Sequence, residues 1–226
     1  MLIKPVSSLD IHMCVFILII YPKLSQADKY VMQTYNNIGY HLHPLTEQEL
    51  KPIWDEIDQV TPDFGPNTVN HKAELNNCRS HVEAVVMQQI IEYNHAFNWP
   101  NRLRVLDRPV NLKLSQLWVN WMGKYEASPI HNHEGVMSFV IWMRVPYTHE
   151  EEVLARPHVP PHLNFGGEFA LHYTDTLGQI RSEFLPILDS ALCLFPSGLN
   201  HSVFPYYSTD SIRVSIAGNF MFDPGP

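Results

Sequence analysis

The chain has 226 residues, which is the size of one ordinary domain. Hydrophobic residues make up 45% of it and charged residues only 17%, so it can build a sizeable core and does not have the composition of a disordered chain. The formal net charge of −8 argues against nucleic acid or an anionic membrane as a partner, because no basic stripe is present. Histidine is unusually frequent, at 13 residues, and it is the commonest metal ligand in proteins.

The first 31 residues form an N-terminal extension whose role the sequence leaves open. Residues 13–21 (MCVFILIIY) are an apolar run that is too short to span a bilayer stably. Three interpretations fit the run: a secretory signal over residues 1–27, a buried strand, or a stretch translated upstream of a start at Met32. We therefore expect a single domain over residues 32–226.

The cysteines indicate the compartment. There are three of them, an odd number, and no two are spaced as a CxxC pair: Cys14, Cys78 and Cys193. This usage favours a reducing environment and argues against a zinc-thiolate site. A cytoplasmic location is the expectation, and the secretory signal is the alternative.

Two helices are predicted at the start of the domain. Thr46 opens a Thr-x-x-Glu capping box, with apolar residues at helical spacing behind it, although Pro52 leaves a start near Lys51 as an alternative. Ser80 opens a second capping box, and an apolar face continues from it to Phe97. The residues between the two helices, 61–70 (TPDFGPNTVN), are expected to form a loop.

From Val110 onward the sequence is typical of β-strands. The predicted strands are separated by turns rich in Pro and Gly, and the acidic run at 149–152 is expected to be a solvated loop. This order predicts a mainly β sandwich or barrel with the N-terminal helices packed on one outer face. The strand candidates are 112–121, 135–145, 168–173, 191–195, 202–204 and 212–222.

A His-x-His pair is the first candidate for metal binding. His131 and His133 are two residues apart on an extended segment, so their side chains point to the same side and can reach one ion. His201 lies 68 residues after His133, at the start of another predicted strand. Two paired histidines and one distant histidine make a facial set that leaves coordination positions open. Four other histidines are expected in loops flanked by proline, have no partner arginine, and are interpreted as background: His41, His43, His158 and His162.

Arg213 is the second candidate, twelve residues after His201. On a strand it shares a face with Ser215, so a guanidinium and a hydroxyl would point at one ligand. A guanidinium holds a carboxylate by two parallel hydrogen bonds. If Arg213 faces the core it needs an anion, because an unpaired buried charge is costly. The alternative is an outward Arg213 on a solvated strand.

These motifs together carry a resemblance to a known family. His131-Asn132-His133 before an apolar strand, then FPSGLNHSVFP around His201, RVS at Arg213 and AGNF near the end resemble the small 2-oxoglutarate/Fe(II)-dependent oxygenases of bacteria and phages. The likeness covers about residues 112–222. These residues fall within the motif-bearing core of the expected domain, at about 110–222. It implies a double-stranded β-helix (a cupin-like jelly-roll) with helices on one outer face.

The resemblance also implies an activity and its site. The reaction would couple oxidative decarboxylation of 2-oxoglutarate to hydroxylation of a small-molecule or peptidyl substrate by dioxygen, with ascorbate as a further candidate cofactor. Iron would be bound by His131, His133 and His201. The far carboxylate of 2-oxoglutarate would lie at Arg213 with Ser215, and the further cosubstrate contacts would be Asn120 and Tyr125.

One departure concerns the third metal ligand. The wider superfamily has a carboxylate where this chain has His133, which predicts either a three-histidine site or a recruited carboxylate. Glu134 is adjacent and stands where the subfamily has proline, but on a strand it would point the opposite way.

Aromatic walls that exclude water are expected from Trp118, Trp142 and Phe204.

Two other functions remain open at this stage. A three-histidine cupin metalloenzyme, a dioxygenase or isomerase acting without 2-oxoglutarate, would use the same histidines, since Pro196-x-Gly198-x-x-His201 matches half of the second cupin motif. A non-catalytic jelly-roll binding or structural module is the other alternative. The direction of Arg213 separates them, because an inward guanidinium near the histidines favours a 2-oxoglutarate site.

Overall fold

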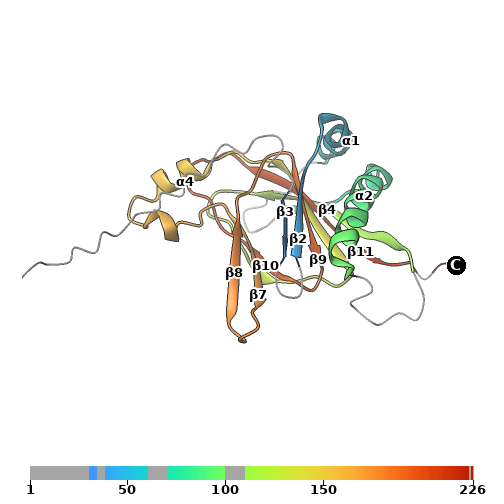
Figure 1. Ribbon diagram of the computed structural model, residues 1–226. Coiled ribbons are helices and arrows are strands. Elements are labelled where there is room, and N and C mark those ends of the chain that lie inside the picture. Colours follow the sequence, from blue (N-terminus) through green and yellow to red (C-terminus); the bar gives the residue numbers. More distant parts are fainter. Residues whose placement is uncertain (1–30, 35–38, 61–70, 100–109, 224, 226) are drawn as a thin grey trace, which may run out of the picture.

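The computed structural model describes residues 31–34, 39–60, 71–99, 110–223 and 225. The apolar run at 13–21 and the predicted loop at 61–70 lie outside the described residues. The described chain forms three layers, a pair of helices, a seven-stranded sheet and a four-stranded sheet (Figure 1). The predicted mainly β jelly-roll with helices on one outer face is confirmed.

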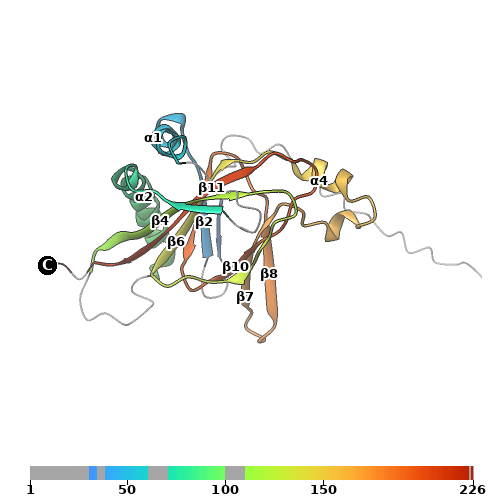
Figure 2. The ribbon, with the colours of Figure 1, turned by 180° about the vertical axis from the view of Figure 1, so that it is seen from behind.

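All neighbouring strands in both sheets are antiparallel. The large sheet has the order β1 (Val31–Thr34), β2 (Gly39–Pro44), β9 (Ala191–Pro196), β6 (Met137–Arg144), β11 (Arg213–Phe222), β4 (Leu112–Met122) and β3 (His71–Glu74). The small sheet has the order β5 (Ser128–His131), β10 (Asn200–Val203), β7 (Phe169–Thr174) and β8 (Ile180–Leu185). Figure 2 shows β3 next to β4, where it forms one edge of the large sheet.

The central strands of the large sheet are buried on both faces. On β6, Phe139 and Ile141 pack toward the helices, whereas Val140 and Trp142 pack toward the small sheet. A strand alternates its side chains between two faces, so a strand covered on both sides reads as an unbroken apolar run. This explains the runs SFVIWM and ALCLF, and it divides the apolar core into two clusters.

The first helix, α1 (Glu47–Ile57), begins at its predicted capping box. The Glu49 amide donates to Thr46 Oγ1 over 3.3 Å, and the Thr46 amide donates to Glu49 Oε2 over 2.7 Å. The alternative start near Lys51 is wrong. Pro52 lies inside the helix, where the two reciprocal cap bonds secure the preceding turn.

The second helix, α2 (Arg79–Phe97), does not use its predicted capping box. It starts one residue before Ser80, and the cap residue Cys78 makes no side-chain bond to the helix. The carboxylate of Glu56 on α1 instead accepts hydrogen bonds at 2.6–3.0 Å from the three backbone amides that lead into α2, at Asn76, Asn77 and Cys78. The predicted capping box is not used because a carboxylate from another helix accepts hydrogen bonds from these amides.

Glu56 is therefore expected to contribute measurably to stability. Its burial favours the neutral form, but the amide hydrogen bonds outweigh this effect and lower the pKa of Glu56 below its usual 4.5. With a lowered folded pKa, the stabilisation is complete above pH 4.5 and is lost as the pH falls through the folded value. Glu56→Gln should reduce the free energy of unfolding at pH 7 by about 1–3 kcal/mol in urea titrations.

The pH dependence provides the control for this prediction. The difference between wild type and Glu56→Gln should narrow as the pH falls below 4.5. The exposed Glu74 on β3 offers a matched substitution, and Glu74→Gln should change stability by less than about 0.5 kcal/mol. Equal effects of the two substitutions would contradict the role given to Glu56.

The acidic run at 149–152 is helical, so the predicted solvated loop is wrong. It forms α4 (His149–Ala155), capped by a reciprocal box between Thr148 and Glu151. Glu152 is fully buried and accepts hydrogen bonds from the amides of Tyr207 and Ser208 at 2.7 and 2.9 Å. The charge is tolerated because the backbone of a distant loop satisfies it.

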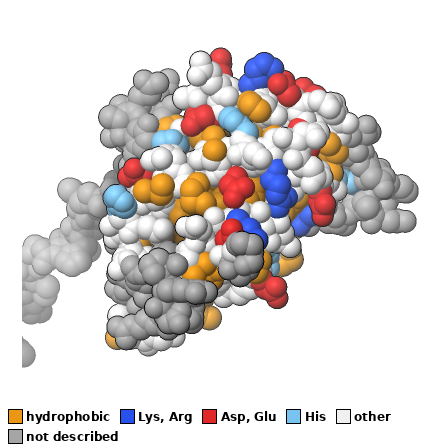
Figure 3. Space-filling view, turned by 90° about the vertical axis from the view of Figure 1, so that its right-hand side faces the viewer, with side chains coloured by type: hydrophobic (Ala, Val, Ile, Leu, Met, Phe, Trp, Pro, Cys, Tyr) orange, Lys and Arg blue, Asp and Glu red, His pale blue; other side chains and the backbone are white. Residues whose placement is uncertain are grey.

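On the face that carries α1 and α2, acidic and basic side chains are interspersed, with apolar side chains between them (Figure 3). Among the described residues, no helix combines the length and the apolar character needed to cross a bilayer.

Candidate functional site

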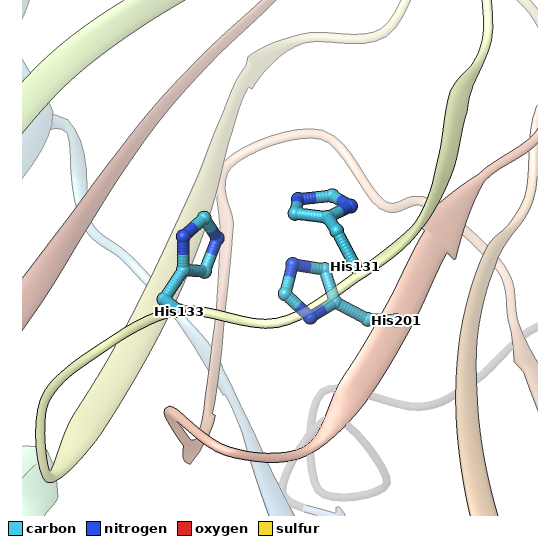
Figure 4. A group of neighbouring side chains, drawn as sticks. All are labelled: His131, His133 and His201. Atoms are coloured by element: carbon cyan, nitrogen blue, oxygen red, sulfur yellow. The ribbon is translucent and has the colours of Figure 1, made fainter.

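Three histidine rings converge between the two sheets (Figure 4). His131 ends β5, His133 follows in the next loop, and His201 lies on β10. The potential ligand nitrogens of the three rings all lie within 4.8 Å of one another. The histidines selected from the sequence are thus brought together, and imidazole nitrogen suits Fe, Zn, Cu or Ni.

The backbone orients two of the rings. His131 and His201 are paired across β5 and β10. The Nδ1 of His131 lies 2.7 Å from the Pro129 carbonyl oxygen, and the Nδ1 of His201 lies 3.0 Å from that of Leu199. A carbonyl only accepts, so each Nδ1 carries the proton and each Nε2 keeps a free lone pair for a metal.

Two of the rings, His133 and His201, are in the protonation state that a metal requires. Burial and repulsion from neighbouring cationic groups lower the pKa of His133 to about 4, and burial together with the neighbouring rings lowers the pKa of His201 to about 3. Both imidazoles are neutral at pH 7, which is the form that coordinates metal. Aromatic rings support them, since Trp118 lies 5.7 Å from His133 and Phe195 lies 4.9 Å from His201, centroid to centroid.

A buried polar network joins the loop of His133 to the turn before His201. The His133 amide donates to the Ser197 carbonyl over 2.9 Å. The Ser138 hydroxyl lies 2.9 Å from Ser197 Oγ and 2.7 Å from Asn219 Oδ1. These bonds join β6, β11 and the turn that follows β9, and the same turn holds the backbone of His133.

Arg213 points inward and lines the same cavity as the three histidines. It is only 2% exposed, and no Asp or Glu in the described part of the chain forms an ion pair with it. The cavity is open to solvent, and its lining combines aromatic side chains with a few polar ones. A buried guanidinium at a cavity, without an acidic partner, is suited to an anionic ligand.

Neutral groups hold the guanidinium in place. Arg213 Nη1 donates to Tyr147 Oη over 2.5 Å, and the Tyr147 hydroxyl donates in turn to the Gly167 carbonyl over 2.8 Å. The guanidinium carbon also lies 5.6 Å from the ring centroid of Tyr206 and within hydrogen-bonding reach of Met122 Sδ. Burial raises the pKa of Tyr147, so its hydroxyl stays protonated and can serve both neighbours. Tyr147 gave no signal in the sequence.

A row of polar side chains crosses the sheet beside Arg213. Ser215 is paired with Asn120 across β11 and β4, and Asn120 is paired with Lys72 across β4 and β3. All three line the cavity. The Trp118 indole donates to Asn120 Oδ1 over 3.1 Å and so fixes the amide. Lys72 was missed in the sequence because β3 is short and lies far from the motifs.

Two predicted residues lie elsewhere. Tyr125 is 66% exposed and contacts Tyr207 outside the cavity lining. Trp118 and Trp142 line the cavity as expected, but Phe204 does not, and it packs instead with Phe165 and Phe184.

The background histidines are not all in loops, which corrects the prediction. His41 and His43 lie on β2, and His41 Nε2 is 3.1 Å from the side-chain oxygen of Gln89 on α2. Helix α2 lies over this face of the sheet, and neither histidine belongs to a metal-binding group among the described residues. His158 lies in a turn, and His162 lies in the short 3₁₀ helix Pro161–Leu163.

Solved structures share this fold. A 2OG-Fe(II) oxygenase family oxidoreductase from Burkholderia pseudomallei has a TM-score of 0.50 at 13% identity over 80% of this chain and 84% of that chain. A prolyl-4-hydroxylase from Pseudomonas putida has a TM-score of 0.52 at 13% identity over 81% and 92%. HygX from Streptomyces hygroscopicus, with nickel, 2-oxoglutarate and hygromycin B bound, has a TM-score of 0.52 at 9% identity over 82% and 83%. At these identities the likeness establishes the fold.

The comparison with protein families identifies the domain. No curated protein sequence matches the chain. Residues 116–219 match the family described as "Putative 2OG-Fe(II) oxygenase". This stretch contains the three convergent histidines, the inward arginine and the serine that shares its strand face. The matched stretch is just under half of the chain, and it forms a domain similar to the 2OG-Fe(II) oxygenases.

Proposed function

We propose that this oxygenase binds Fe(II) through His131, His133 and His201 and anchors 2-oxoglutarate through Arg213, in order to hydroxylate a small-molecule or peptidyl substrate. The observation that carries the proposal is the buried guanidinium of Arg213, which lines the histidine cavity without an acidic partner among the described residues. A three-histidine cupin that acts without 2-oxoglutarate would leave this charge unexplained.

The donor set fits a ferrous ion. Three imidazoles would supply nitrogen ligands on one side, and a side for further ligands is left toward the cavity. Glu134 is exposed and is not a member of the cluster, so His133 is the third ligand in this proposal. When bound, Fe(II) and 2-oxoglutarate supply an oxidation in which dioxygen is reduced while 2-oxoglutarate is decarboxylated to succinate.

The protein contributes binding, orientation and exclusion of water. The planar fork of Arg213 would hold the far carboxylate of 2-oxoglutarate, with Tyr147 fixing the fork and Ser215 and Asn120 offering further hydrogen bonds. The aromatic side of the cavity, which includes Trp142, keeps water from this region and strengthens the charged contacts.

The fold is compatible with both substrate classes. One similar structure contains hygromycin B and another is a prolyl-4-hydroxylase, so related scaffolds accommodate small molecules and prolyl substrates. The proposed function therefore covers both substrate classes.

Anaerobic titration followed by exposure to air tests the proposed function. We expect 2-oxoglutarate to bind the protein loaded with Fe(II), and slow release of succinate once dioxygen is admitted, even without a primary substrate. Calorimetry measures the binding, and chromatography measures the succinate. A protein that binds Fe(II) but shows no affinity for 2-oxoglutarate would contradict the proposal and would favour the cupin alternative.

A further inference from the structure

Lys72 places a second cation at the rim of the cavity. On β3, Ala73 packs toward the core beneath the helices, so alternation turns Lys72 to the opposite face, where it lines the cavity. It is paired with Asn120, which is paired with Ser215, so the ammonium lies in the same cross-strand row as the proposed 2-oxoglutarate contacts. Because β3 is an edge strand, Lys72 stays accessible from solvent.

The charge of this cavity is not balanced by the protein. No Asp or Glu of the described residues lines it, although the chain as a whole is acidic. Lys72, Arg213 and a divalent metal bring four positive charges, of which the two carboxylates of 2-oxoglutarate neutralise two. A three-histidine ligand set leaves this excess in place, because it lacks the negative charge of a carboxylate ligand. A further anion in the cavity is therefore electrostatically favoured.

The surroundings of Lys72 indicate where that anion would bind. Its Nζ lies 5.6 Å from the ring centroid of Trp118, and the Trp118 ring lies 5.7 Å from that of His133. The indole is thus close to both the ammonium and a proposed metal ligand. No acidic group of the described chain forms an ion pair with Lys72. An ammonium beside an indole surface suits an anionic group attached to an apolar body.

We propose that the primary substrate is an anionic small molecule, a carboxylate or phosphate ester, whose charged group binds Lys72 while its apolar part lies against Trp118. This inference rests on the proposed function, because it assigns Arg213 to 2-oxoglutarate and leaves Lys72 for the substrate. The reacting carbon would then lie between Trp118 and the three histidines.

Binding of matched probes tests this inference without relying on turnover. The enzyme is loaded anaerobically with Fe(II) and saturated with 2-oxoglutarate, and its affinities for benzoate, phenyl phosphate and neutral benzamide are measured by calorimetry. We expect one of the two anions, benzoate or phenyl phosphate, to bind about tenfold more tightly than benzamide. Lys72→Met should reduce this preference for the anion over benzamide to about twofold. The anion with the larger preference distinguishes a carboxylate from a phosphate substrate.

Two controls complete the test. Lys113→Met removes an exposed lysine of β4 that pairs with Asp223, and it should leave the anion preference unchanged. The affinity for 2-oxoglutarate should stay within about twofold of wild type in Lys72→Met. Equal binding of the charged and neutral probes, no measurable anion binding, or an anion preference that survives Lys72→Met would overturn the proposal.

Failure of the proposed function gives a different result. If wild-type enzyme does not bind 2-oxoglutarate, the titrations are repeated with Fe(II) alone, where a preference for anions that depends on Lys72 would still support the substrate class. If Lys72→Met weakens the binding of 2-oxoglutarate and not the binding of the probes, Lys72 belongs to the cosubstrate site and the substrate proposal is wrong.

Discussion

Replacing Arg213 by methionine is expected to weaken 2-oxoglutarate binding at least about 100-fold while metal affinity stays unchanged. The reason is that Arg213 is buried and would make a charge-assisted, two-pronged contact with the far carboxylate. Loss of one partner of such a buried pair costs about 2–5 kcal/mol, and 100-fold in affinity corresponds to about 2.7 kcal/mol. Calorimetric titration of 2-oxoglutarate into the Fe(II)-loaded variant measures the change.

Arg213→Lys separates the charge from the shape of the guanidinium. Lysine keeps the positive charge but has no planar fork. The affinity of Arg213→Lys for 2-oxoglutarate should therefore fall between those of wild type and Arg213→Met. In the absence of 2-oxoglutarate, Arg213→Met should be no less stable than wild type in thermal unfolding, because the unpaired buried charge is gone. Wild-type affinity for 2-oxoglutarate in Arg213→Met would refute the assignment of the anchor.

His201→Ala is expected to abolish measurable Fe(II) binding and, with it, the release of succinate. His201 is 4% exposed, and its free Nε2 is one of three nitrogens that converge. The two remaining histidines, His131 and His133, would offer only a half-exposed pair of ligands, which is too few for a stable site. Metal content after anaerobic loading and desalting measures the loss, and circular dichroism reports whether the fold is retained.

His162→Ala is the matched control for this substitution. His162 is exposed in a 3₁₀ turn away from the cluster, so its replacement should leave metal content and succinate release at wild-type levels. If His201→Ala is folded and still retains stoichiometric iron, the three-histidine centre proposed for this protein is wrong.

Several elements followed from local pattern alone. The strand that carries Arg213 and a strand starting directly after His201 were predicted because β-formers and turn residues alternate over short windows. The facing of Arg213 and Ser215 followed from the period of two along a strand. The local pattern gave a wrong prediction where a residue distant in sequence makes the hydrogen bonds. Glu56 accepts from the amides before α2 in place of the predicted capping box, and the loop at Tyr207 donates to Glu152, which was expected in a solvated loop.

The two His-x-His pairs show the limit of a motif most clearly. His41 and His43 have the same spacing as His131 and His133, and both pairs lie on or next to strands. The first pair is on the face of its sheet that α2 covers, where His41 meets Gln89. The second pair opens onto the cavity that also receives His201. The spacing of a His-x-His pair places both side chains on one face of a strand. The element packed on that face determines which groups they contact.

Histidine, at 13 residues, was the feature of the composition that suggested a metal site, and the sequence by itself determined which three of them belong together and which arginine accompanies them. Only the tertiary structure showed that this arginine is buried without an acidic partner, that Tyr147 holds it, and that Lys72 shares its cavity. The physical reason is that a strand's own sequence sets which side chains share a face, whereas long-range pairing sets which strands lie side by side. Lys72 reaches the site through the pairing of β3 with β4, which no local pattern encodes.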